Sequence, residues 1–177
     1  MSKAIFLDRD GTINEDVGDL CTIDKLFFTT NAIEALKILQ QAGYILIIIT
    51  NQTGINKGIF SREQFLKFNE EYLKILKNFG VEIKEVFYCP HLKEENCVCR
   101  KPSTYFIQKA KEKYKINLLE SYVIGDHPHD IEMGNNAKTK TIYLLSGHGR
   151  KHLNELKIQP NYIAENLYEA TLWITKK

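Results

Sequence analysis

Short apolar runs recur along this chain, and the segments between them have helical spacing. The runs occupy residues 4–7, 44–49, 85–88, 122–125 and 141–145, and a sixth candidate strand is NYIA at 161–164. Apolar runs of this length, bounded by turn residues, are typical of strands buried on both faces of a sheet. Because the strands alternate with helices, the expected fold class is α/β, with a parallel sheet covered by helices on both faces.

The helices are predicted from their end signals and their apolar spacing. Asn31 and Ser61 each precede Glu or Gln by three positions, which is the spacing of a capping box, and Gly43 and Gly80 follow the two helices. Helices are therefore expected at 31–43, 61–80, 104–114, from about 128, and at 165–174. One face of the second helix is apolar, and we interpret it as core: Phe65, Phe68, Tyr72, Ile75, Leu76 and Phe79.

Composition and charge limit the class of partner. The 177 residues are 44% apolar, enough for one domain at 1–177 with a sizeable core. With 24 Lys and Arg against 22 Asp and Glu, the net charge of +2 is too small to favour nucleic acid or a membrane surface. The first apolar run is too short for a signal segment and no run could span a membrane, so we expect a soluble, cytoplasmic protein, with a monomer as the default.

Polar residues follow the apolar runs where a parallel sheet collects its ligands, at the carboxyl ends of the strands. Asp8, Asp10 and Asp126 are expected to converge at this edge, where like charges would repel one another unless a cation lay between them. Carboxylate ligands favour Mg2+, and Thr50 and Lys101 would suit a phosphoryl group beside it. Taken singly, Asp8 and Asp10 could instead be ordinary acidic residues of a loop, and Lys101 could be a solvated side chain.

Three of the four cysteines lie close together with one histidine. Cys89, His91, Cys97 and Cys99 form two close pairs, C-x-H and C-x-C, within a loop at about 89–101. Thiolate and imidazole ligands at this spacing are typical of a structural, tetrahedral Zn2+ site. A disulfide is the alternative, but the odd number of clustered thiols argues against it, and Cys21 is expected to be a free thiol.

Four short stretches resemble the motifs of haloacid dehalogenase (HAD) superfamily phosphatases. They are DRDGT, TNQ, RKP and GDHPHD, in that order, and the resemblance extends from residue 4 to about 145. It implies a Rossmann-like, HAD-type parallel sheet and a phosphomonoester hydrolase that acts through an aspartyl-phosphate. Asp8 would be the nucleophile, and Asp10 would protonate the leaving oxygen and later activate water.

The same resemblance assigns the remaining residues of the motifs. Mg2+ would be held by Asp8, the backbone carbonyl of Asp10 and Asp126. Thr50 and Lys101 would hold the oxygens of the transferring phosphoryl group. Asp130 matches the second acid of the fourth motif and is expected in a supporting position. The longest irregular segments, 11–30 and 89–103, are too short for a large cap domain, so an open site is expected.

Within the superfamily, a zinc loop of this kind resembles two families, the D-glycero-D-manno-heptose 1,7-bisphosphate phosphatases and the histidinol-phosphate phosphatases. LDRDGTIN, AGYILIIITNQTGINKGIFSREQF and CPH look like the heptose family, which favours a 7-phosphatase or a close sugar-phosphate phosphatase. Against this, the five-residue spacing from His91 to Cys97 is more like that of the histidinol enzymes, and His127 stands where heptose enzymes commonly have lysine. By similarity, a phosphorylated small molecule would contact Asp16, Val17, Gly18, Asp19, Thr50, Asn51, Gln52, Thr53, Arg100 and Lys101.

Several alternatives remain open from the sequence. His127 and His129 are either solvated or contact the substrate, and the segment 146–152 is either a surface loop, the preferred interpretation, or part of the rim of the pocket. A polynucleotide end phosphatase would need a basic stripe with aromatic residues, which the chain lacks. A zinc-stabilised binding module without catalysis is a further alternative, although Asp8, Asp10 and Lys101 are all present.

Overall fold

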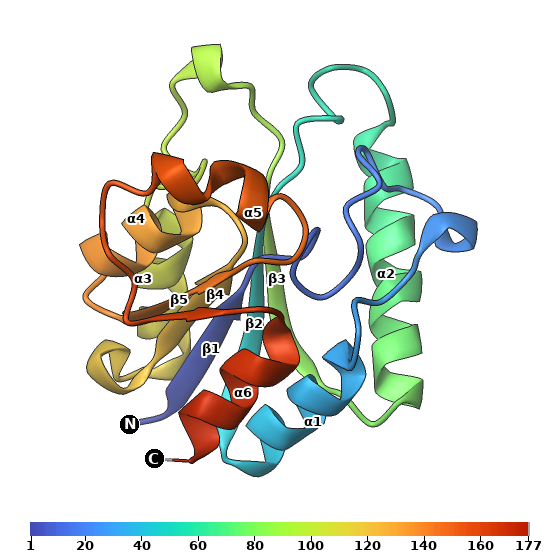
Figure 1. Cartoon of the computed structure of the whole chain (residues 1–177). Helices are drawn as coiled ribbons and strands as arrows, with labels where there is room; N and C mark the ends of the chain where they lie inside the picture. Colours follow the sequence, from blue (N-terminus) through green and yellow to red (C-terminus); the bar gives the residue numbers. More distant parts are fainter. Residues whose placement is uncertain (177) are drawn as a thin grey trace.

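Six parallel strands form one sheet in the computed structural model, which describes residues 1–176 (Figure 1). The strand order is β3-β2-β1-β4-β5-β6, and Lys177 of the predicted domain lies outside the described residues. The strands are β1 (Lys3–Leu7), β2 (Tyr44–Asn51), β3 (Ile83–Cys89), β4 (Tyr122–Gly125), β5 (Lys140–Leu144) and β6 (Tyr162–Ala164). The predicted α/β class and parallel sheet are confirmed.

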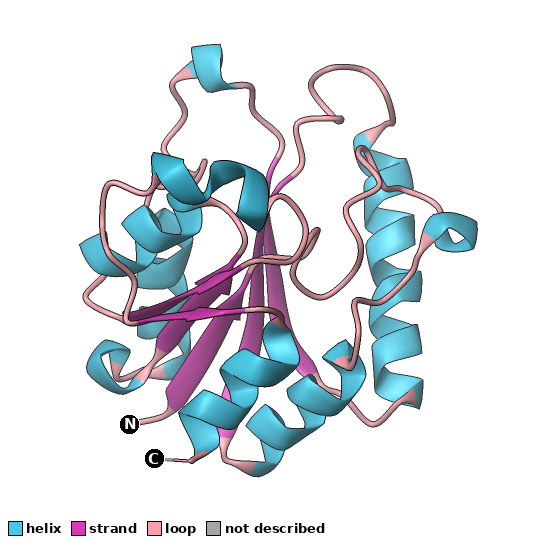
Figure 2. Ribbon diagram, viewed as in Figure 1, coloured by secondary structure: helices cyan, strands magenta, loops and turns pink. Residues whose placement is uncertain are grey.

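Helices cover both faces of the sheet (Figure 2). Ile5 and Leu7 of β1 belong to the core that includes α1 (Ala32–Gln41), α2 (Arg62–Asn78) and α6 (Leu167–Thr175). Ala4 and Phe6, which alternate with them, pack in the second core with α3 (Tyr105–Tyr114) and α4 (Pro128–Asn136). A short helix that was not predicted, α5 (Gly149–His152), follows β5, and single 3-10 turns lie at Ile23–Lys25, Lys93–Glu95, Leu118–Glu120 and Leu153–Glu155.

Three local predictions differ from the structure. The strand β3 is not buried on both faces, because it lies at the edge of the sheet and most of its residues are only partly covered. The capping box at Asn31 is wrong, since Asn31 is in the left-handed region (φ 57°) and its side chain makes no capping hydrogen bond. Phe79 is 48% exposed, because it lies at the end of α2. The capping box at Ser61 is confirmed by two hydrogen bonds with Gln64, of 3.0 and 2.6 Å.

The topology determines where a site can form. From β1 the chain passes to β2 on one side, and it later returns to β4 on the other side of β1. The carboxyl ends of β1, β2 and β4 therefore meet at a switch point, where open α/β sheets bind ligands. The connecting loops gather at this edge, with the loop after β3 projecting beyond it (Figure 1). Among residues 1–176, no helix is long and apolar enough to cross a membrane.

Candidate active site

Three carboxylates and one lysine lie together at the switch point. Asp8 follows β1, Asp126 follows β4, and Asp130 is in the first turn of α4. One carboxylate oxygen of each lies within 4.8 Å of the others. Lys101, which is only 4% exposed, places Nζ 2.9 Å from Asp8 Oδ1 and 2.7 Å from Asp130 Oδ1. Two of the three acids therefore share a single buried ammonium group.

Burial and charge shift the protonation of this cluster. Burial raises the pKa of Asp8 well above its ordinary value, although the charge of Lys101 opposes the shift. Burial and the nearby charge of Asp130 raise the pKa of Asp126 to about 7. Burial by itself would lower the pKa of Lys101, but the carboxylates of Asp130 and Asp8 raise it above its ordinary value. One ammonium group does not balance three crowded carboxylates, so a divalent cation would favour their ionised forms.

Backbone segments approach Asp126 very closely. A Cβ atom on Gly11 or on Gly147 would lie 2.3 Å from Asp126 Oδ2, and both glycines have positive φ, at 80° and 53°. The backbone N–H of His148 donates a hydrogen bond to the same oxygen at 2.8 Å. The hydroxyl of Ser146 donates to the carbonyl oxygen of Gly11 at 2.8 Å. The loop after β5 thus fixes the orientation of this carboxylate.

The side chain of Asp10 takes a different direction from that of Asp8. Its carboxylate accepts hydrogen bonds from the guanidinium of Arg9, from Asn14 Nδ2 at 2.9 Å and from Gln52 Nε2 at 2.9 Å. Asp130, rather than Asp10, completes the cluster of carboxylates around Lys101. The sequence placed Asp130 one turn beyond Asp126 but did not show that it would pair with the lysine.

A cavity of about 510 Å³ lies above the cluster and brings together nearly all of the predicted site residues. Its lining includes Asp8, Asp10, Asp16, Gly18, Asp19, Thr50, Asn51, Gln52, Thr53, Arg100, Lys101 and Asp126. Val17 is the exception, since it does not line the cavity and is 47% exposed. Lys57 also lines it and was not among the predicted residues, and three histidines whose roles the sequence left open line it as well: His127, His129 and His148. For Lys57, the one sequence signal for a role in the cavity was its position in a loop between Gly54 and Gly58.

Four histidines form a row along one side of this cavity. His127, His129 and His148 line it, and the ring of His152 lies between those of His127 and His148, with neighbouring ring centroids 4.6 to 6.0 Å apart. Burial lowers the pKa of His127 to about 4 and holds that of His129 below its ordinary value, so both rings are neutral at neutral pH. The preferred interpretation of 146–152 as a plain surface loop is wrong for His148.

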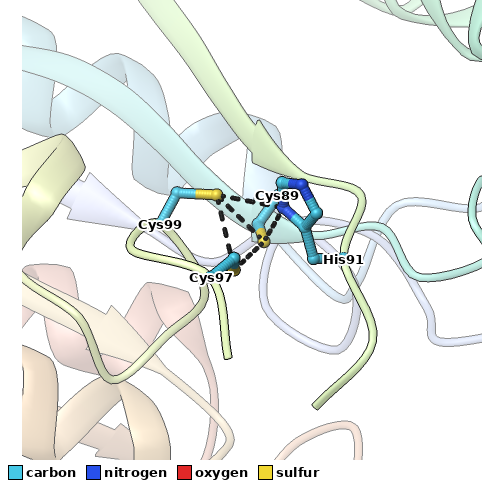
Figure 3. A group of neighbouring side chains, drawn as sticks. All are labelled: Cys89, His91, Cys97 and Cys99. Carbon is cyan, nitrogen blue, oxygen red and sulfur yellow. Dashed lines mark hydrogen bonds between the residues drawn. The ribbon is translucent and has the colours of Figure 1, made fainter. Parts of the chain in front are cut away.

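The predicted zinc ligands converge at the end of β3 and in the loop that follows it (Figure 3). The three sulfur atoms of Cys89, Cys97 and Cys99 are 3.2 to 3.7 Å apart. His91 Nδ1 lies 3.5 and 3.4 Å from the sulfur atoms of Cys89 and Cys99. A regular tetrahedron with Zn–S bonds of about 2.3 Å and Zn–N bonds of about 2.0 Å has edges of about 3.5 to 3.8 Å. The separations are close to these edges, so the four residues fit a tetrahedral zinc ion.

The loop that carries the predicted zinc ligands is tied to the cavity through its last residues. Arg100 Nη1 donates to the carbonyl oxygen of His91 at 3.1 Å, which folds the loop back on itself. The backbone N–H of Lys101 donates to Asn51 Oδ1 at 3.2 Å, at the end of β2. Asn56 also reaches across to Glu95, with contacts of 2.9 and 3.0 Å. The position of Lys101 thus depends on both the sheet and the loop.

The fold and the site define a hydrolase of the HAD type, with an aspartate at the end of the central strand and a buried lysine beside it. A family model described as HAD-hydrolase-like matches residues 98–170. D-glycero-beta-D-manno-heptose-1,7-bisphosphate 7-phosphatase from Pasteurella multocida is 39% identical over 173 residues, which cover 94% of each chain. D-glycero-alpha-D-manno-heptose-1,7-bisphosphate 7-phosphatase from Photorhabdus laumondii is 38% identical over 167 residues, which cover 90% of this chain and 91% of the relative.

A solved structure is similar over almost the whole chain. It is D,D-heptose 1,7-bisphosphate phosphatase from B. bronchiseptica complexed with magnesium and phosphate, with a TM-score of 0.90, 25% identity and 98% of each chain covered. The chain belongs to the heptose-1,7-bisphosphate 7-phosphatase family of HAD-type phosphatases.

Proposed function

We propose that this protein is a Mg2+-dependent phosphatase that removes the 7-phosphate of D-glycero-D-manno-heptose 1,7-bisphosphate. The observation that carries the chemistry is the ion pair of 2.9 Å between Lys101 and Asp8 at the base of the cavity. It holds a carboxylate oxygen beside a fixed positive charge, where an incoming phosphoryl group would be stabilised. The names of the two curated relatives support the substrate.

In the proposed reaction, a carboxylate oxygen of Asp8 attacks phosphorus while the bond from phosphorus to the sugar oxygen breaks. Asp10 gives its proton to that sugar oxygen, so the sugar leaves as a neutral alcohol. The ionised Asp10 then takes a proton from water, which attacks phosphorus and releases phosphate from Asp8. Lys101 and the hydroxyl of Thr50 would bind the phosphoryl oxygens in both steps.

The oxygen-rich cluster fits a hard divalent cation. Asp8 and Asp126 would hold Mg2+ with the backbone carbonyl of Asp10, as the motifs imply, and Asp130 would stay paired with Lys101. When bound, Mg2+ would neutralise charge on the phosphoryl group and keep Asp8 ionised. The magnesium and phosphate named for the similar solved structure support this assignment.

The cluster of Cys89, His91, Cys97 and Cys99 fits Zn2+ in a structural site. With four protein ligands, the site would have no open position for water or substrate. The role of zinc would be to hold the loop that carries Arg100 and Lys101. Because the described chain supplies every residue of the proposed site, we also propose that it acts as a monomer.

The charges that line the cavity support a substrate with two phosphates. Lys57 and Arg100 are the cations of the cavity besides Lys101, and we assign them to the second phosphate. Asp16 and Asp19 supply acceptors for sugar hydroxyl groups.

Two measurements test the proposal at two levels. For the chemistry, Asp8→Asn should abolish release of phosphate in the presence of Mg2+, and turnover that survives this change would contradict the nucleophile. For the substrate, kcat/KM should be at least about 100-fold higher for the heptose bisphosphate than for histidinol phosphate or an aryl phosphate. Equal values would contradict the substrate and leave a general phosphatase. Both anomers should be compared, since the two relatives differ in the anomer that their names carry.

A further inference from the structure

Arg9 is a charged side chain with no exposed surface. Its guanidinium carbon lies 5.9 and 5.2 Å from the ring centroids of Phe65 and Phe68, on the inner face of α2. Its Nη1 finds no hydrogen-bond partner among the described residues. A buried charge with one unpaired donor costs stability, so packing alone does not explain an arginine at this position.

Among the described residues, the other two guanidinium nitrogens of Arg9 donate hydrogen bonds to Asp10. Nε donates to Asp10 Oδ1 at 3.1 Å, and Nη2 donates to Oδ1 at 2.9 Å and to Oδ2 at 2.7 Å. A two-point contact of this kind fixes both the plane and the rotation of a carboxylate. The side chain of Asp10 is 17% exposed and lines the cavity, so Arg9 holds it from the side of the core.

Two amides complete the surroundings of this carboxylate. Asn14 donates to Oδ1 and Gln52 donates to Oδ2, each at 2.9 Å, and Gln52 also donates to Thr50 Oγ1 at 2.9 Å. Arg9 itself does not line the cavity. Its backbone N–H donates to Asp8 Oδ1 at 2.7 Å, but its guanidinium reaches the reacting groups through Asp10.

We propose that Arg9 is a positioning residue that sets the orientation from which Asp10 transfers protons. The inference rests on the proposed function, in which Asp10 protonates the leaving oxygen and later activates water. Because Arg9 is separated from the substrate by Asp10, its loss should lower kcat and leave KM nearly unchanged. Lysine keeps the charge but lacks the planar fork, so it should not replace arginine here.

The test compares Arg9→Met and Arg9→Lys with the parent protein. On the heptose bisphosphate, Arg9→Met should lower kcat about 100-fold, within the usual range for loss of a proton-transfer group, with KM changed less than about twofold. Arg9→Lys should lower kcat by at least about tenfold. The matched control is Arg62→Met, since Arg62 also lies on an aromatic ring, that of Tyr88, but is exposed and outside the cavity. It should retain the kcat of the parent.

A second substrate separates positioning from a general loss of structure. With 4-nitrophenyl phosphate the leaving group needs no proton, so Arg9→Met should release a first equivalent of nitrophenolate at close to the parent rate. Hydrolysis of the aspartyl-phosphate would then be slow, because Asp10 also activates water, and a burst should appear. When Asp10→Asn has already removed the carboxyl group that Arg9 orients, Arg9→Met should change kcat by less than about threefold. The effects of residues that act as a unit are not additive.

Two results would overturn the inference. The first is that both Arg9 variants keep the kcat of the parent protein. The second is that Arg9→Met lowers kcat by the same factor with and without the Asp10→Asn change, which would mean that Arg9 acts on the fold. If Arg9→Met fails to fold, Arg9→Lys decides, with the melting temperature measured alongside kcat. The proposed function fails separately: turnover by Asp8→Asn would remove it, whereas an inactive Asp8→Asn protein with fully active Arg9 variants would remove only this inference.

Discussion

Replacing Lys101 with methionine tests the electrostatic account of the site most directly. The change keeps the length and most of the volume of the side chain but removes the charge that lies 2.9 Å from Asp8 and 2.7 Å from Asp130. The three crowded carboxylates would then lose the ammonium group that two of them share. Removing one partner of a buried ion pair costs about 3 to 5 kcal/mol of folding free energy. Losing one group that stabilises the transition state lowers kcat about 100-fold to 1000-fold.

The direction of the pH effect follows from the raised pKa values. A carboxyl whose folded pKa is raised contributes stability below its unfolded pKa, and that stability is lost as the pH rises through the folded pKa. The charge of Lys101 lowers the pKa of Asp8, so the substitution raises this pKa further. The loss of stability in Lys101→Met should therefore be larger at pH 8 than at pH 5.

The assay is urea denaturation at pH 5 and pH 8 in magnesium-free buffer that leaves zinc bound, together with steady-state kinetics in Mg2+. Lys113→Met is the matched control, because Lys113 also pairs with a carboxylate at 2.9 Å, that of Glu85, but its side chain is 57% exposed. An exposed pair contributes about 0 to 1 kcal/mol. Equal unfolding free energies for the two variants at pH 8, or a fall in kcat/KM of less than about tenfold for Lys101→Met, would refute the reasoning.

Three further predictions concern the metal sites and the loops around them. Burial raises the pKa of Asp126 to about 7. Without Mg2+, the unfolding free energy of the parent should therefore fall by about 3 kcal/mol more than that of Asp126→Asn between pH 5 and pH 8, as measured by urea denaturation. Cys97→Ser should reduce bound zinc from one equivalent to near zero and lower the melting temperature, whereas Cys21→Ser should change neither, as metal analysis and thermal melts would show. Gly11→Ala should lower kcat/KM at least about tenfold, because its Cβ would lie 2.3 Å from Asp126 Oδ2, while Gly58→Ala, with similar φ but open space around it, should cost stability only.

The strands of the central sheet were predictable because their signal is local. The apolar run at 122–125 coincides with β4, and that at 44–49 lies within β2. The strand β3 was predicted to be buried on both faces because an apolar run does not indicate whether the strand lies at the edge of the sheet or between two other strands. The αL conformation of Asn31 was missed for a related reason, since its sequence spacing also fits a capping box.

The sequence alone determined the chemical groups and the strand ends that carry them. Asp8, Thr50 and Asp126 follow apolar runs, and the spacing of Cys89 to Cys99 indicates a soft metal, because residue type and local spacing fix these properties. The tertiary structure alone decided which groups meet. It pairs Lys101 with Asp130, and it places Arg9 between Asp10 and the aromatic face of α2. The contacts of Lys101 with Asp130 and of Arg9 with α2 join segments that are distant in sequence, and they depend on sheet order and helix packing, which no local pattern encodes.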